Sequence, residues 1–143
     1  MIVAFTGPSY LYREQELAVV ARMEELDYQE RNGGEFVTWR SGCAYGVDTI
    51  AARQAILSDV LSIEMYVPAA IHNHDLVEEL GERVRVIRLP VTSEPYRKRN
   101  EAMVTGADLL VAFVKSRSFY RSGEWMTVNI ARKLGVEVDL NVI

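Results

Sequence analysis

The sequence predicts an α/β protein built on a doubly wound, mainly parallel sheet with helices on both faces. Two observations favour this class. Apolar runs of strand length recur along the chain, and several are continuous rather than alternating, which is typical of strands covered on both sides. Segments with helical spacing separate these runs, so strand and helix alternate through nearly the whole chain.

The apolar runs define the expected strands, which are residues 2–5, 36–39, 62–67, 84–89, 108–114 and 136–142. The run at residues 84–89 differs from the others because Arg85 and Arg88 interrupt it. Charged side chains are tolerated best where a strand has only one neighbour. We therefore expect this strand at an edge of the sheet.

Apolar stripes predict which helix faces are buried. The expected stripes are Leu17 with Val20 and Ala21, Ala51 with Ala55, and Met126 with Ile130 and Leu134. Gly135 follows the last stripe directly and is expected to end that helix as its C-cap.

Length and composition limit the class of protein. The chain has 143 residues, which predicts one domain over residues 1–143. Sixteen basic and twenty acidic residues give a net charge of −4, which argues against nonspecific duplex binding. A single cysteine excludes an intramolecular disulfide, and no apolar stretch is long enough to span a membrane. We expect a cytoplasmic protein.

Ligands of doubly wound sheets bind beyond the carboxyl ends of the strands. The loops to inspect are therefore residues 6–9, 41–48, 90–100 and 115–125. All four hold the unusual residues of the chain, and this coincidence is the main functional indication in the sequence.

The segment "SGCAYGVD" leads from an expected strand into an expected helix. Its small residues, Ser41, Gly42, Ala44 and Gly46, would let backbone N–H groups approach a phosphate at the helix N-terminus. The alternative is an ordinary strand-to-helix turn with Asp48 as the N-cap. Cys43 is expected to pack rather than react.

The segment "TGPS" forms a second turn of this kind, after the first strand. Gly7 permits close backbone approach, Thr6 and Ser9 offer hydroxyl groups, and Pro8 shapes the turn. The alternative is a turn followed by a Ser9 helix cap. Neither a Walker loop nor a full dinucleotide fingerprint is present.

The densest basic stretch is "YRKRN", expected just before a helix at residues 101–107. An arginine here could clamp a phosphate or carboxylate bidentately. We expect Arg99 and Asn100 to point inward and the other two charges to be solvated.

The segment "SRSFYRSGEW" offers another anion cradle at Ser122 and Gly123. Glu124 favours the first turn of the following helix, and Trp125 is expected in the core. Phe119 and Tyr120 are the candidates for stacking or for an oligomer contact.

The segment "IHNHD" contains three potential metal ligands, His72, His74 and Asp75, within four residues. Such a group rarely forms a site without a further ligand elsewhere in the chain. We expect no metal, and a capping role for Asn73 or Asp75 instead.

Taken together, "TGPS", "SGCAYGVDTIAARQA", "RNEAM", "ADLLVAFVKS" and "SGEWMTVNIARKLGVEV" resemble the SLOG superfamily. This superfamily includes the DNA-processing Smf/DprA core, the LOG phosphoribohydrolases and small YpsA/YspA-like members, to which the chain is most similar. The resemblance implies a Rossmann-like domain that binds a nucleotide or nucleotide-derived ligand. Its phosphate would lie between the loop at residues 42–46 and the Ser122–Gly123 pair. It also implies a homodimer or higher homo-oligomer. We expect no cofactor.

The resemblance leaves catalysis open. LOG-type hydrolases place a catalytic glutamate where this sequence has Thr127, and threonine cannot replace that carboxylate. Glu124 or Asp48 would have to serve instead. The leading hypothesis is a sensor or sequestering domain, and the second is an N-glycosidic hydrolase or transferase acting on nucleoside monophosphates. A DprA-like single-strand binder using Arg97, Lys98, Arg117 and Arg121 is the third, and nucleic acid is not the expected partner.

Overall fold

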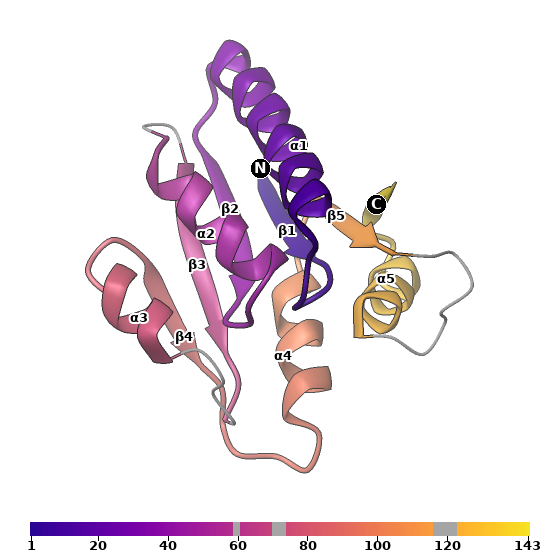
Figure 1. Cartoon of the computed structure of the whole chain (residues 1–143). Helices are drawn as coiled ribbons and strands as arrows, with labels where there is room; N and C mark the ends of the chain where they lie inside the picture. Colours follow the sequence, from indigo (N-terminus) through magenta and orange to yellow (C-terminus); the bar gives the residue numbers. More distant parts are fainter. Residues whose placement is uncertain (59–60, 70–73, 116–122) are drawn as a thin grey trace.

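The computed structural model describes residues 1–58, 61–69, 74–115 and 123–143 (Figure 1). Strand and helix alternate along these residues as the sequence predicts. The elements are β1 (Ile2–Thr6), α1 (Arg13–Gly33), β2 (Val37–Gly42), α2 (Val47–Ile56), β3 (Leu61–Val67), α3 (His74–Leu80), β4 (Arg85–Arg88), α4 (Pro95–Val104), β5 (Leu109–Val114), α5 (Gly123–Lys133) and β6 (Glu137–Val142).

Within the described residues the strands form one parallel sheet in the order β4-β3-β2-β1-β5-β6. The chain moves outward from β1 to β4, returns to the other side of β1 as β5, and ends at β6. This reversal makes the sheet doubly wound and places the switch point between β1 and β5. The arginine-interrupted strand β4 lies at an edge, which confirms that prediction.

The two faces of the sheet carry separate apolar cores. Side chains of α1, α2 and α3 pack with Val3 and Phe5 of β1 on one face. Side chains of α4 and α5 pack on the other face, against Ala4 of the same strand. Successive residues of β1 thus pack into opposite cores. Burial on both faces explains why the predicted strands are continuously apolar.

Two of the three predicted helix stripes are wrong in detail. In α1 the buried residues are Val19, Met23 and Leu26, whereas Leu17 is 55% exposed. The buried set, from Val19 to Leu26, extends over about two turns, while the expected one covers a single turn. Packing therefore favours the longer stripe. The Ala51 and Ala55 stripe of α2 is buried as predicted.

In α5 the buried face is that of Trp125, Val128 and Ala131, and Leu134 is exposed. The large indole of Trp125 lies in the core as expected, and its burial sets the rotation of the helix. Gly135 ends α5 as predicted, with φ +75° and its N–H donated to the Arg132 carbonyl.

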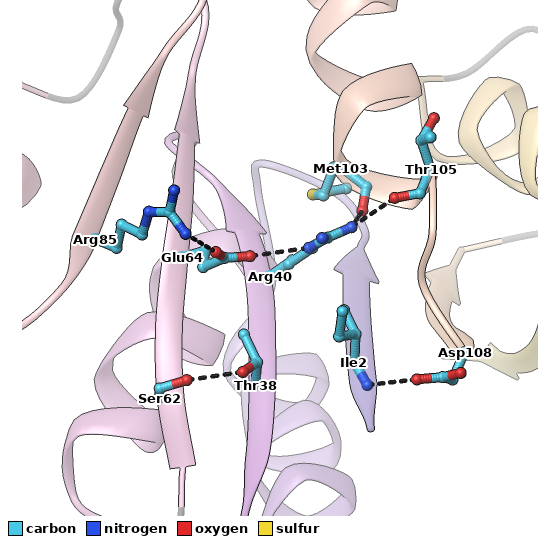
Figure 2. Close-up of polar contacts among 9 residues, drawn as sticks. All are labelled: Ile2, Thr38, Arg40, Ser62, Glu64, Arg85, Met103, Thr105 and Asp108. Carbon is cyan, nitrogen blue, oxygen red and sulfur yellow. Dashed lines mark hydrogen bonds and ion pairs between the residues drawn. The ribbon is translucent and has the colours of Figure 1, made fainter.

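Arg40 fastens the end of α4 to the sheet (Figure 2). Its Nη1 donates to the carbonyl oxygens of Met103 at 3.2 Å and Thr105 at 2.7 Å. Its Nε donates to Glu64 on the neighbouring strand at 3.0 Å, and Glu64 also accepts from Arg85. One guanidinium therefore joins β2, β3 and the C-terminus of α4.

No helix in the described part of the chain is long and apolar enough to span a membrane.

We predict that Arg40→Met lowers the free energy of unfolding by about 3 kcal/mol, because it leaves two carbonyls and a largely buried carboxylate without their partner. Urea unfolding followed by circular dichroism measures this. Arg85→Met is the matched control: it removes the other, exposed partner of Glu64 and should change stability by less than about 1 kcal/mol. Equal losses in the two variants would contradict the anchoring role of Arg40.

Candidate functional site

A cleft of about 370 Å³ opens at the carboxyl ends of the strands, beside the switch point. Four segments that are distant in sequence supply its walls. The lining residues are Thr6, Gly7 and Ser9 after β1, Ala44 and Asp48 at the start of α2, Tyr96, Arg99, Asn100 and Met103 of α4, and Gly123, Glu124 and Met126 of α5.

Three buried polar side chains form the floor of the cleft. Arg99, Asn100 and Asp48 are 8%, 5% and 7% exposed. Arg99 Nε donates to Asn100 Oδ1 at 2.7 Å, and its Nη1 lies 3.9 Å from Asp48 Oδ2. The predicted inward orientation of Arg99 and Asn100 is confirmed. Arg97 and Lys98 are more than half exposed, as expected for the solvated charges of this stretch.

The Arg99–Asp48 pair joins the two layers of the fold. Asp48 belongs to α2 on one face of the sheet and Arg99 to α4 on the other, and they meet beyond the end of β2 at Gly42. A Cβ atom on Gly42 would lie within about 2.5 Å of both Arg99 Nη1 and Asp48 Oδ2. Gly42 is therefore required by this ion pair.

Burial raises the pKa of Asp48 from 3.8 to about 6, although Arg99 and the Ala44 N–H both favour the carboxylate. The Ala44 N–H donates to Asp48 Oδ2 at 3.3 Å. Asp48 is thus held in the cleft at a cost to stability when it is ionised. Perturbed carboxyl groups of this kind are common at functional sites.

Two more of the glycines predicted to approach a ligand, Gly7 and Gly46, also approach protein atoms, whereas Gly123 does not. A Cβ on Gly7 would overlap the Val47 side chain, and one on Gly46 would overlap the Pro8 carbonyl oxygen. Gly46 also has φ +74°, which disfavours other residues. Close packing of the two loops against each other accounts for both glycines, because Val47 N–H donates to that same Pro8 oxygen at 3.2 Å.

Two capping predictions are wrong. Gly46, not Asp48, is the N-cap of α2, and the Asp48 carboxylate turns back toward Ala44 instead of the helix. Ser9 does not cap α1, which begins at Arg13 after an N-cap at Tyr12. At the start of α2 the Val47 N–H donates to the Pro8 carbonyl, and at the start of α1 the Tyr12 N–H donates to the Gln15 side chain, so neither helix uses the predicted cap.

Helix α4 begins at Pro95, so the basic stretch lies within the helix and not before it. Tyr96, Arg99, Asn100 and Met103 then recur at helical spacing and share the face that lines the cleft. Sequence reasoning missed Tyr96, Met103 and Met126. Pro95 could have revealed Tyr96 and Met103, because proline is favoured in the first turn of a helix. A helix that begins there places both residues on the face of Arg99.

The predicted site residues fall into three groups. Those that line the cleft are Thr6, Gly7, Ser9, Ala44, Asp48, Arg99, Asn100, Gly123 and Glu124. Those that instead shape its walls are Pro8, Ser41, Gly42 and Gly46, with Ser41 Oγ donating to the Asp48 carbonyl at 2.7 Å. Those outside the described residues are Ser122, Arg117 and Arg121, together with Phe119 and Tyr120.

Cys43 is buried, and burial raises the pKa of its thiol, so the expected packing role is confirmed. No cluster of three metal-ligating side chains occurs within the described ranges. His72 and Asn73 lie outside those ranges, and Asp75 stands in the first turn of α3. The metal expectation therefore stays a prediction.

The fold is similar to those of two solved structures. One is DNA processing protein A from Helicobacter pylori, which binds single-stranded DNA; the TM-score is 0.71 at 17% identity, covering 98% of this chain and 64% of that one. The other is TM1055, a structural-genomics target, with a TM-score of 0.65 at 15% identity, covering 96% and 71%.

This chain therefore spans less than two thirds of DNA processing protein A. No family model and no curated protein matches the sequence. The architecture is a Rossmann-like doubly wound α/β fold. At these identities the likeness concerns the fold alone.

Thr127, at the position where the resemblance places a catalytic glutamate, does not line the cleft. It is fully buried, and its Oγ1 donates to the Gly123 carbonyl one turn earlier in α5 at 3.0 Å. Among the described residues, the carboxyl groups that line the cleft are those of Asp48, in α2, and Glu124, in α5.

We predict that Asp48→Asn changes the pH dependence of stability. Because the folded-state pKa of Asp48 is raised, the contribution of this group to stability is greatest below about pH 4, and roughly 3 kcal/mol of it is lost as the pH rises through about 6. The difference in unfolding free energy, variant minus wild type, should therefore increase over this interval. Burial also raises the pKa of Glu30 to about 7. Because Glu30 is present in both proteins, its contribution cancels in this difference. Parallel profiles from pH 4 to 8 would contradict the prediction.

Proposed function

We propose that this chain is a SLOG-type domain whose cleft binds a phosphorylated, nucleotide-derived ligand in a sensing or sequestering role. The observation that carries the proposal is the buried Arg99 on the cleft floor. A buried arginine needs an anionic partner, and Asp48 lies at 3.9 Å with a carboxyl group that burial tends to neutralise.

Arg99 keeps donor capacity for a ligand. Guanidinium carries five N–H donors in a planar fork that suits phosphate. Among the described residues its polar contacts use Nε, to Asn100, and Nη1, near Asp48. Nη2 is left for a phosphate oxygen in the cleft.

The rest of the cleft suits the remainder of such a ligand. Its volume of about 370 Å³ falls within the range of small-molecule sites. Thr6 and Ser9 supply hydroxyl groups, Gly7 and Gly123 supply backbone without side-chain bulk, and Tyr96 supplies an aromatic wall. From the resemblance to the SLOG superfamily, we also propose that the chain forms a homodimer or a higher homo-oligomer.

We predict that Arg99→Ala weakens binding of nucleoside monophosphates by roughly ten- to a hundredfold, the loss expected for charge-assisted hydrogen bonds. Calorimetry with AMP, GMP, CMP and UMP measures it. Arg97→Ala is the matched control, because Arg97 lies in the same helix, is exposed and pairs with Glu101. Arg99→Lys should recover only part of the affinity. Unchanged affinity in a folded Arg99→Ala protein would remove Arg99 from the site.

Cleavage of an N-glycosidic bond is the second candidate, favoured by the two carboxyl groups that line the cleft. Asp48, with its pKa near 6, could act as a proton donor while Glu124 stabilises positive charge on the sugar. The role of single-strand binder has weaker support here, because Arg97 and Lys98 both pair with Glu101 and form no open basic track.

If cleavage occurs, we predict that Glu124→Gln lowers release of free base from nucleoside monophosphates at least roughly a hundredfold without a matching loss of affinity. Chromatography of the incubated nucleotides measures base release. No release by the wild-type protein across the panel would leave the binding role alone.

A further inference from the structure

A cluster of two tyrosines and a lysine follows the carboxyl ends of β1 and β5, beside the switch point. Tyr10 and Tyr12 are 66% and 62% exposed, and their rings meet edge to face with centroids 5.6 Å apart. Lys115 Nζ lies 5.3 Å from the Tyr10 centroid and 5.5 Å from the Tyr12 centroid. One ammonium group is therefore shared by two exposed rings.

Folding of the loop does not require these aromatic side chains. Leu11, between them, is the residue that anchors the loop, since it is 8% exposed and belongs to the core. The start of α1 is capped through the Tyr12 backbone, whose N–H donates to Gln15 Oε1 at 2.9 Å. Adjacent exposed aromatics of this kind usually mark a binding surface.

The cluster lies next in the chain to segments that line the cleft. Tyr10 directly follows Ser9, which lines the cleft. Lys115 directly follows β5, which pairs with β1 through Thr6, another lining residue. The cluster is therefore held by the ends of neighbouring elements beside the switch point.

We propose that Tyr10 and Tyr12 form a stacking platform for the nucleobase of the ligand whose phosphate is bound by Arg99. This inference rests on the proposed function. It adds to phosphate binding a second element of recognition, the stacking of a planar, electron-rich base. Nucleobases stack on aromatic side chains, and the ammonium of Lys115 attracts the electron-rich face and the ring-nitrogen lone pairs of a base.

The test compares a ligand that has a base with one that lacks it, using calorimetry with AMP and with ribose 5-phosphate. The double variant Tyr10→Ala/Tyr12→Ala should lose roughly tenfold or more in AMP affinity, the effect of removing a stacking partner. Its affinity for ribose 5-phosphate should be unchanged. Tyr10→Phe/Tyr12→Phe is the matched control and should bind AMP as the wild type does, because the rings remain.

Unchanged AMP affinity in the alanine variant overturns the platform, and so does an equal loss for both ligands. In either case wild-type binding of ribose 5-phosphate leaves the proposed function standing. If the wild type binds neither ligand, the proposed function fails and the platform fails with it.

Discussion

The contact between Arg99 and Asp48 is the constraint on which the site depends. It joins helices from opposite faces of the sheet beside Gly42, whose lack of a side chain leaves room for the contact. The same contact places a permanently charged guanidinium and a carboxyl group with a raised pKa on the floor of one cleft. Both the shape and the charge of the cleft follow from this pair.

Contacts around the pair hold each helix in place. On one side, the Pro8 carbonyl accepts the Val47 N–H, which fixes the N-terminus of α2 against the β1–α1 loop. On the other side, Arg40 binds the last carbonyls of α4 and ties them to Glu64 (Figure 2). The glycines of the two loops permit these approaches between protein segments. Their small size thus builds the cleft, which is a different reason from direct phosphate contact.

The sheet could be predicted from the sequence because continuous apolar runs and their order carry most of that information. The inward position of Arg99 also followed, since its neighbours Arg97 and Lys98 suit solvent. The buried faces of α1 and α5 could not be predicted, because each helix offers two apolar stripes and tertiary packing decides between them. The partner of Asp48 was hidden for a similar reason: its nearest charge, Arg99, is 51 residues away, and an aspartate near a helix start is ordinarily a cap.

The central claim is that the pair of Arg99 and Asp48 marks a ligand site and is not merely a structural joint. The most direct measurement is a titration of isotope-labelled protein with nucleoside monophosphates, followed by two-dimensional amide NMR. The account predicts that a saturating ligand shifts the amide signals of Gly7, Ala44, Asp48 and Gly123, which border the cleft. Shifts confined to the groove around Glu30 and Leu109, at the amino ends of the strands, or no shifts with any of the four nucleotides, would contradict it.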